Sequence, residues 1–152
     1  PNDIYVADKK ICGILIENSM RGEHLSSSII GIGLNINQRN FDVNLPNPTS
    51  MILETGICED IKLCLEEFMA IFRHNLVAAL SSGLNLRESY LSHLWRRDIP
   101  AQYIASALEH QHSQCEFTGI IRNLTPIGHL LIEDTEKGEL KEFAFKEIGY
   151  IL

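Results

Sequence analysis

Residues 9–37, KKICGILIENSMRGEHLSSSIIGIGLNIN, decide the fold of this 152-residue chain. A continuous apolar run with β-branched residues occupies 10–18, and a second apolar segment occupies 26–37. Both have the length and composition of strands, the first of them a buried one. The polar stretch from Ser19 to Glu23 contains a glycine and predicts the hairpin connection. We therefore expect two paired antiparallel strands in this part of the molecule.

The rest of the chain predicts helices followed by short strands. After a loop over 38–48, Thr49 or Ser50 can cap a helix that Gly56 ends. Apolar residues at i, i+3/i+4 spacing predict the longest helix over 61–80, and a shorter amphipathic helix follows over 86–95. From Pro100 onward, short strands separated by glycine turns predict a small barrel of roughly 50 residues. We place the domain boundary near Ile99–Pro100.

Composition limits the classes of protein that fit. The chain has 45% hydrophobic residues and a formal net charge of −7. This charge argues against a nucleic-acid surface, since phosphate binding depends on clustered Lys and Arg. The compact basic group, Arg96-Arg97, has Asp98 beside it. No segment approaches the roughly 20 apolar residues that span a bilayer, and no basic-then-apolar leader is present. We expect a cytoplasmic protein without a membrane partner.

Cysteine and histidine patterns do not predict a metal site. The four cysteines show no C-x-x-C pairing and lie among apolar residues, which predicts buried free thiols. The pair His110 and His112 lies in a polar, turn-like segment, which predicts a solvated loop. The four cysteines are Cys12, Cys58, Cys64 and Cys115.

Lys10 is the first candidate for chemistry. Taken alone, a lysine at the start of a strand is an ordinary surface residue, and Lys9 stands next to it. However, Gly13 follows three residues later, and Asn2-Asp3 precede it on a strand expected to be adjacent. A compact ammonium group held there could neutralise a carboxylate and a phosphate together. Asn2-Asp3, after a proline, is also typical of a turn, so the combination carries the prediction.

The second strand carries two further kinds of candidate. Gly31 and Gly33 cost stability inside a strand, so they mark a place where backbone or ligand approaches closely. Asn35 and Asn37 are two residues apart, so on a strand both side chains would point to the same face of the sheet. Their carboxamides need partners, either a ligand phosphate or ribose or a backbone group. The glycines do not form a dinucleotide fingerprint, because the third glycine and the following helix are missing.

Together these motifs resemble the second half of the catalytic domain of biotin–protein ligases, followed by its C-terminal SH3-like domain. The resemblance implies an α+β fold. By this resemblance, residues 1–99 are expected to form part of a class II synthetase-like mixed sheet with helices on one face, and residues 100–152 a small SH3-like β-barrel. The matching segments are 1–4, 10–17, 31–37, 46–50, 128–132 and 143–148.

The family resemblance also implies an activity. Such enzymes activate biotin with ATP and Mg²⁺ to biotinyl-5′-AMP, and then pass biotin to a lysine of a biotin carrier protein domain. By this resemblance Lys10 is the catalytic lysine, which touches the biotin carboxylate and the α-phosphate. Asp3 is implied to orient or deprotonate the incoming carrier lysine.

The remaining implied roles concern ligand binding. Asn2 reaches the adenine and Asn35 the phosphate side of the adenylate. Gly13, Gly31 and Gly33 leave room for the biotin chain. No residue is implied as a metal ligand.

The resemblance leads to two further expectations, on activity and on association, and leaves three alternative functions open. In the family, a Gly-Arg-rich loop over the adenylate and the serine and arginine contacts to biotin lie upstream of the residues that match. We therefore expect the isolated chain to be inactive, and we expect association between copies through an exposed sheet edge or a second polypeptide. The alternatives are a non-catalytic partner-binding module, a truncated remnant, and a lipoate–protein ligase-like transferase that shares the fold and the single lysine.

Overall fold

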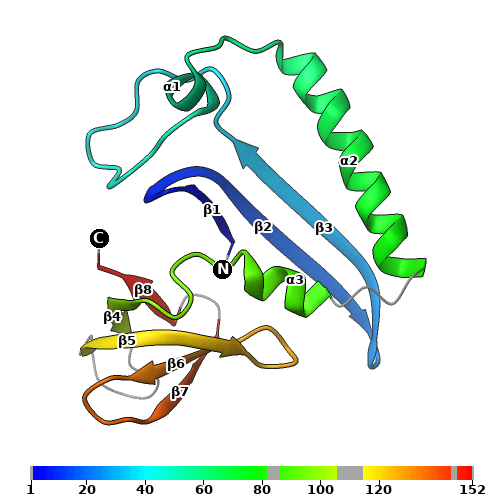
Figure 1. The fold of residues 1–152 in the computed structure, drawn as a ribbon. Helices are drawn as coiled ribbons and strands as arrows, with labels where there is room; N and C mark the ends of the chain where they lie inside the picture. The colour runs from blue at the N-terminus through cyan, green and yellow to red at the C-terminus, as the bar shows by residue number, and fades with distance from the viewer. Residues whose placement is uncertain (1, 82–85, 106–114, 145–146, 152) are drawn as a thin grey trace. The chain divides into compact units, whose positions relative to one another are not determined.

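The computed structural model describes residues 2–81, 86–105, 115–144 and 147–151 (Figure 1). The chain divides into two compact units, Pro1–Ser82 and Gly83–Leu152. The boundary predicted near Ile99–Pro100 lies inside the second unit. Leu91 and Leu94, which precede that boundary, pack against the core of the second unit.

The first unit contains a three-stranded antiparallel sheet in the order β1-β2-β3. The strands are β1 (Asp3–Val6), β2 (Lys9–Arg21) and β3 (His24–Leu34). The predicted hairpin between β2 and β3 is present, with a connection shorter than expected. Arg21 pairs with His24, and Gly22 between them has a φ of 64°, a conformation that glycine adopts without a steric cost.

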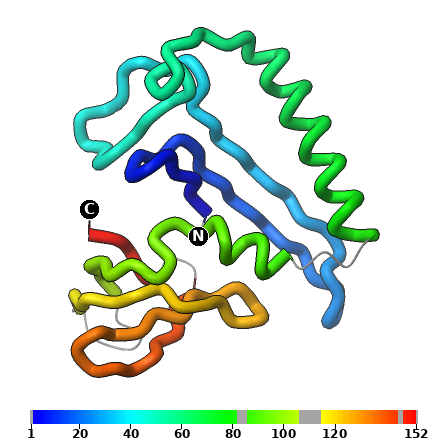
Figure 2. The backbone as a smooth tube through the Cα atoms, viewed as in Figure 1, coloured from blue at the N-terminus to red at the C-terminus, as the bar shows by residue number. Residues whose placement is uncertain are grey.

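Two helices follow the sheet, as the tube in Figure 2 traces. They are α1 (Met51–Thr55) and α2 (Ile61–Ser81), and the second matches the longest predicted helix. Gly56 ends α1 in the left-handed region, and its N–H donates to the carbonyl of Ile52 at 2.9 Å. Ser50 occupies the N-cap position, but its hydroxyl donates to the carbonyl of Gln38. The predicted side-chain cap is therefore wrong.

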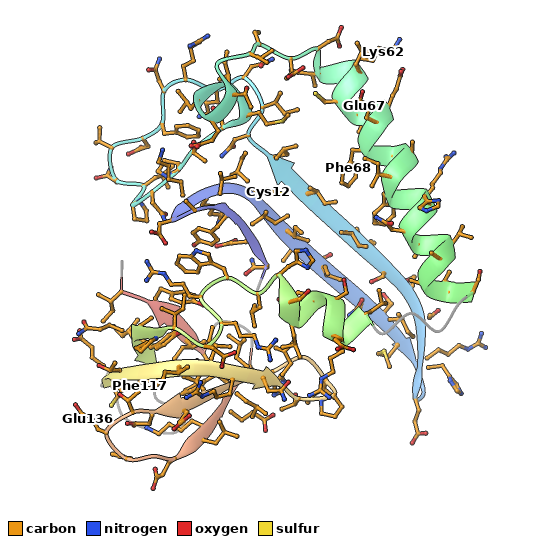
Figure 3. All side chains as sticks on the ribbon, viewed as in Figure 1. Cys12, Lys62, Glu67, Phe68, Phe117 and Glu136 are labelled. Atoms are coloured by element: carbon orange, nitrogen blue, oxygen red, sulfur yellow. The ribbon has the colours of Figure 1, made fainter. Side chains whose placement is uncertain are left out.

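The apolar run of β2 is buried only at its start. Ile11 and Cys12 are buried, and beyond Ile14 the strand is exposed, as is all of β3. Leu15 is 53% exposed and Ile29 is 67% exposed. The described part of α2 contains no buried residue, although Figure 3 shows Phe68 on the side of the helix toward β3. The prediction of a buried strand over 10–18 is thus wrong for its second half.

The second unit is a helix followed by a five-stranded antiparallel sheet in the order β7-β6-β5-β4-β8. Its core joins strands from across this sheet and contains Tyr103, Ile121 and Ile132. No pairing between β7 and β8 is present among the described residues, so the predicted closure into a barrel is not seen. The elements are α3 (Leu86–Ser92), β4 (Pro100–Ala105), β5 (Cys115–Leu124), β6 (Leu130–Asp134), β7 (Leu140–Phe143) and β8 (Ile148–Tyr150).

The prediction of four buried free thiols is correct for Cys12 and wrong for the other three cysteines. All four thiols are free, but Cys58 and Cys115 are exposed and Cys64 is half-buried, so only Cys12 is a buried thiol. Figure 3 labels Cys12 on β2. His110 and His112 lie outside the described residues. No helix in the described part of the chain is long and apolar enough to cross a membrane.

Candidate functional site

A β-bulge shapes the start of β2. Asp3 lies opposite Gly13 and Ile4 opposite Cys12, but the next residue of β1, Tyr5, lies opposite Lys10. Ile11 is therefore the extra residue, with no partner in β1. In a regular strand, residues 10 and 13 would point to opposite faces of the sheet, because side chains alternate. The bulge removes one step of this alternation and brings Lys10 to the face of Gly13.

In this orientation, the Lys10 side chain forms an ion pair with Asp3. The Nζ atom of Lys10 lies 2.8 Å from Oδ1 of Asp3, and both side chains remain partly exposed, at 42% and 30%. A Cβ added to Gly13 would lie 3.7 Å from Cε of Lys10 and 3.9 Å from Oδ1 of Asp3. The ion pair therefore lies directly over a position without a side chain. The structure brings together three of the predicted site residues, Lys10, Asp3 and Gly13.

Lys9 lies in a different environment from Lys10. Its Nζ donates to Oε1 of Glu54 at 3.2 Å. The same carboxylate accepts the hydroxyl hydrogen of Thr49 at 2.5 Å. These two bonds, from Thr49 first and Lys9 second, lower the pKa of Glu54. Each of the two neighbouring lysines thus has its own carboxylate, and only Lys10 lies beside a glycine.

The three predicted glycines form a wall on the same two strands. Gly33 lies opposite Gly13 in the pairing of β2 with β3, and Gly31 lies opposite Leu15. A Cβ at Gly31 would approach the carbonyl of Leu15 at 3.8 Å, and one at Gly33 would approach the carbonyl of Gly13 at 3.9 Å. These are ordinary contact distances. Among the described residues, the protein itself therefore does not require glycine at either position.

The two asparagines do not lie on a strand, because β3 ends at Leu34. The prediction that they share one strand face is wrong. Nδ2 of Asn35 donates to the carbonyl of Thr49 at 2.9 Å. Asn37 forms two bonds with the backbone of Glu59, one at 2.7 Å from Nδ2 and one at 3.0 Å to Oδ1. Both carboxamides thus have the backbone partner that the sequence left open as an alternative.

Sequence reasoning included residues 46–50 among the matching segments but missed that this segment holds the other side of Lys10. The backbone of Pro48 forms a parallel bridge with Lys10. The N–H of Lys10 donates to the carbonyl of Asn47, and the N–H of Thr49 donates to the carbonyl of Lys10, both at 2.8 Å. Nδ2 of Asn47 also donates to the carbonyl of Asp8, in the turn between β1 and β2. No periodicity marks such a single bridge, so no sequence signal could have found it.

Two further groups surround the ion pair. The carbonyl of Asn2 accepts the N–H of Ile14 at 2.6 Å, which places Asn2 at the edge of the site. Burial, and then the charge of Asp3, raise the pKa of the Cys12 thiol, while Lys10 lowers it. Cys12 is therefore a buried neutral thiol. The described residues contain no group of three or more His, Cys, Asp or Glu side chains that could hold a metal ion.

Similar proteins were found by sequence. The bifunctional ligase/repressor BirA of Salmonella typhimurium is 28% identical over 98% of this chain, and that of Bacillus spizizenii is 34% identical over 44% of it. The chain spans 44% of the length of the first of these relatives and 24% of the second. No family model matches the sequence.

Solved structures show the same similarity over nearly the whole chain. The apo biotin protein ligase of Aquifex aeolicus matches 99% of this chain with a TM-score of 0.72 and 25% identity, and the match covers 62% of that ligase. The same ligase in complex with biotin and ATP matches 98% of this chain with a TM-score of 0.69 and 27% identity, over 59% of its own length.

The fold is α+β, with antiparallel sheets and few helices, and it places a lysine–aspartate pair over a glycine wall. Its likeness is to biotin protein ligases, over nearly the whole of this chain. The resemblance predicted from the sequence motifs is thereby confirmed. The predicted SH3-like character of the second unit stays a prediction.

Proposed function

We propose that this chain is the part of a biotin–protein ligase that carries its catalytic lysine. The single observation behind the proposal is the placement of Lys10. Its ammonium group is paired with Asp3 over Gly13, next to a glycine wall that the protein's own packing does not require. The similar ligase that was solved with biotin and ATP supports the choice of ligands.

In the proposed first step, a carboxylate oxygen of biotin attacks the α-phosphorus of ATP. A new phosphorus–oxygen bond forms, the bond to the β-phosphate oxygen breaks, and pyrophosphate leaves. Negative charge gathers on the α-phosphoryl oxygens in the transition state. The Lys10 ammonium is a compact positive charge, suited to stabilise both that charge and the biotin carboxylate.

In the proposed second step, the amine of a carrier-domain lysine attacks the acyl carbon of biotinyl-5′-AMP. An amide bond forms, AMP leaves, and the amine loses a proton. Asp3 is the group that would orient or deprotonate the amine. Because Asp3 also pairs with Lys10, one carboxylate serves both the ammonium that acts first and the amine that arrives later.

The proposed binding roles are those that the family resemblance implies. Gly13, Gly31 and Gly33 would leave space for the biotin chain, Asn2 would reach the adenine, and Asn35 would reach the phosphate side of the adenylate. Mg²⁺ usually binds to nucleotide phosphates with one or two carboxylates and several waters. We therefore propose that Mg²⁺ arrives with ATP, bound chiefly by the phosphates of the nucleotide.

The proposed partners are a biotin carrier protein domain and, through the open sheet edge, a second copy of the chain. The proposed compartment is the cytoplasm, in keeping with the use of ATP. Nucleic acid is not among the proposed partners, because the net charge of −7 does not suit a phosphate-binding surface.

The test measures biotin-dependent exchange of labelled pyrophosphate into ATP, with the protein in its full natural length. We expect exchange with biotin, none without it, and little with lipoate in its place. A second assay follows biotin transfer to a carrier domain. Exchange that depends on lipoate would favour the lipoate ligase alternative. Absence of exchange with either acid, in protein that is folded, would contradict the ligase proposal.

A further inference from the structure

A closed ring of hydrogen bonds surrounds the backbone of Lys10. The N–H of Thr49 donates to the carbonyl of Lys10 at 2.8 Å, and the carbonyl of Thr49 accepts Nδ2 of Asn35 at 2.9 Å. The backbone N–H of Asn35 then donates to the carbonyl of Ile11 at 3.0 Å. The peptide bond between Lys10 and Ile11 closes the ring.

The ring lies at the bulge in β2. Ile11 is the extra residue opposite β1, and on the β3 side of β2 its carbonyl accepts the N–H of Asn35, in the same register in which Cys12 pairs with Leu34. Ile11 is 8% exposed and Thr49 is 1% exposed. Hydrogen bonds among such buried groups are costly to leave unmade. The ring thus holds the bulge, and the bulge sets the direction of the Lys10 side chain.

The ring contains one side-chain group, the amide of Asn35, and the backbone N–H of Asn35 is part of the ring as well. The backbone carbonyl of Asn35 also accepts the N–H of Met51, the first residue of α1, at 2.9 Å. Asn35 therefore connects three segments: the start of β2, the end of β3 and the entry to α1. The Oδ1 atom of Asn35 takes no part in the ring.

We propose that Asn35 is a positioning residue for Lys10, which acts by closing this ring through its side-chain amide. The role is separate from any contact that Asn35 makes with a ligand. Its functional part rests on the proposed ligase activity, whereas its structural part does not. Loss of the amide would free the Thr49 carbonyl, loosen the segment beside Lys10, and let the ammonium move away from Asp3 and Gly13.

The structural test uses the ligand-free protein and three variants. Asn35→Ala removes the amide, and Asn35→Asp keeps the size but has no hydrogen to donate. Asn37→Ala is the matched control, because Asn37 lies two residues from Asn35 and its carboxamide also bonds to backbone, that of Glu59, but it is outside the ring. Amide hydrogen exchange is followed at Thr49, with the Ile14 amide of β2 as a reference for global opening.

We expect both Asn35 variants to lower protection of the Thr49 amide by roughly tenfold relative to Ile14, as for the loss of one buried hydrogen bond. The side-chain NMR signal of Lys10, identified by its disappearance in Lys10→Met, should also shift in these variants. Asn37→Ala should change neither. Unaltered Thr49 protection in both Asn35 variants, or an equal loss in Asn37→Ala, would overturn the proposal.

The functional test asks whether Asn35 acts through Lys10. Pyrophosphate exchange is measured for Asn35→Ala, Lys10→Ala and the double variant. Positioning predicts that Asn35→Ala lowers kcat by up to roughly a hundredfold, as a misplaced group does. It also predicts that the double variant is about as slow as Lys10→Ala alone. Independent effects that multiply would contradict positioning. If the unaltered protein shows no exchange, the proposed function fails, and hydrogen exchange alone decides this inference.

Discussion

Lys9 and Lys10 are neighbours in the chain, but their side chains have different partners. Lys9 pairs with Glu54, and Lys10 pairs with Asp3 over Gly13. The side chains are chemically identical and both are solvent-accessible. Any difference between them in function must therefore come from position, which makes Lys9 a matched control for Lys10.

We predict that Lys10→Ala lowers biotin-dependent pyrophosphate exchange by roughly 100- to 1,000-fold, the usual cost of removing one group that stabilises transition-state charge. Lys10→Arg should restore little activity, because a planar guanidinium does not replace a compact charge. Lys9→Ala should keep most of the activity. Thermal unfolding of each variant separates chemistry from folding. Equal losses in Lys9→Ala and Lys10→Ala would remove the assignment of Lys10.

Asp134 shows how one buried carboxylate organises a turn. Its Oδ2 accepts from Lys141 at 2.7 Å, and its Oδ1 accepts the N–H groups of Glu136 and Lys137 at 3.0 and 3.1 Å. The bond from Lys141 is the largest cause of a pKa below the ordinary value of 3.8, and the two backbone N–H groups lower it further. The folded state therefore holds this proton less tightly than the unfolded state.

The lowered pKa of Asp134 makes the stability of the folded state depend on pH in the acid range. The stabilisation from Asp134 is present above its unfolded pKa and is lost as the pH falls from about 4 through the lower folded pKa. We predict that Asp134→Asn lowers the Tm at pH 7 and flattens the fall of Tm below about pH 4. Glu136→Gln, an exposed neighbour, is the control. Parallel acid unfolding curves for Asp134→Asn and the unaltered protein would contradict the role of Asp134.

At the scale of elements, glycines inside strands have two different causes. A Cβ at Gly119 of β5 would lie 2.6 Å from Cγ2 of Ile132 and 2.9 Å from the ring of Phe117. Gly119 is thus required by the packing of its own sheet. Gly31 of β3 has no such contact, since its nearest neighbour would be the Leu15 carbonyl at 3.8 Å.

We predict that Gly119→Ala lowers the free energy of unfolding by roughly 1–3 kcal/mol, the usual cost of overpacking a core. Gly31→Ala should leave the stability nearly unchanged and weaken binding of biotin. Chemical denaturation and calorimetric titration measure the two effects. If Gly31→Ala also binds biotin normally, the glycine wall is not a ligand surface.

The sequence predicts the elements better than it predicts their surroundings. Local spacing was sufficient for the hairpin, for α2 and for the glycine that ends α1, because these features depend on neighbouring residues. The bulge at Ile11 and the bridge between Pro48 and Lys10 depend on contacts between distant segments. For the same reason, the sequence pattern extended this strand to Asn37, whereas β3 ends at Leu34 and Asn35 bonds to Thr49 and Met51 in the next segment.

At the scale of the whole molecule, the first unit has more apolar surface than its own elements cover. The described residues of β3 form no pairing on the side away from β2. Unpaired strand edges and exposed apolar faces favour association. The most exposed large apolar residues of the sheet are Leu15, Ile16, Met20, Leu25 and Ile29.

We predict that the polypeptide of residues 1–152 self-associates at micromolar concentrations, or binds a second polypeptide that covers this sheet. Sedimentation velocity over a concentration series measures the first outcome. Ile29→Lys, which places a charge on the exposed strand, should weaken association without a loss of β-sheet signal in circular dichroism. A monomer at every concentration that also recruits no covering polypeptide would contradict this prediction.

The bulge at Ile11 also bears on how the length of this segment can change during evolution. With the bulge, Lys10 and Gly13 share a face of the sheet although two residues separate them. Loss of one of those two residues would leave a regular strand in which the ammonium and the glycine still share a face, but the bulge would be gone. Descendants of this gene should therefore have either two codons between these positions together with the bulge, or one codon and a regular strand.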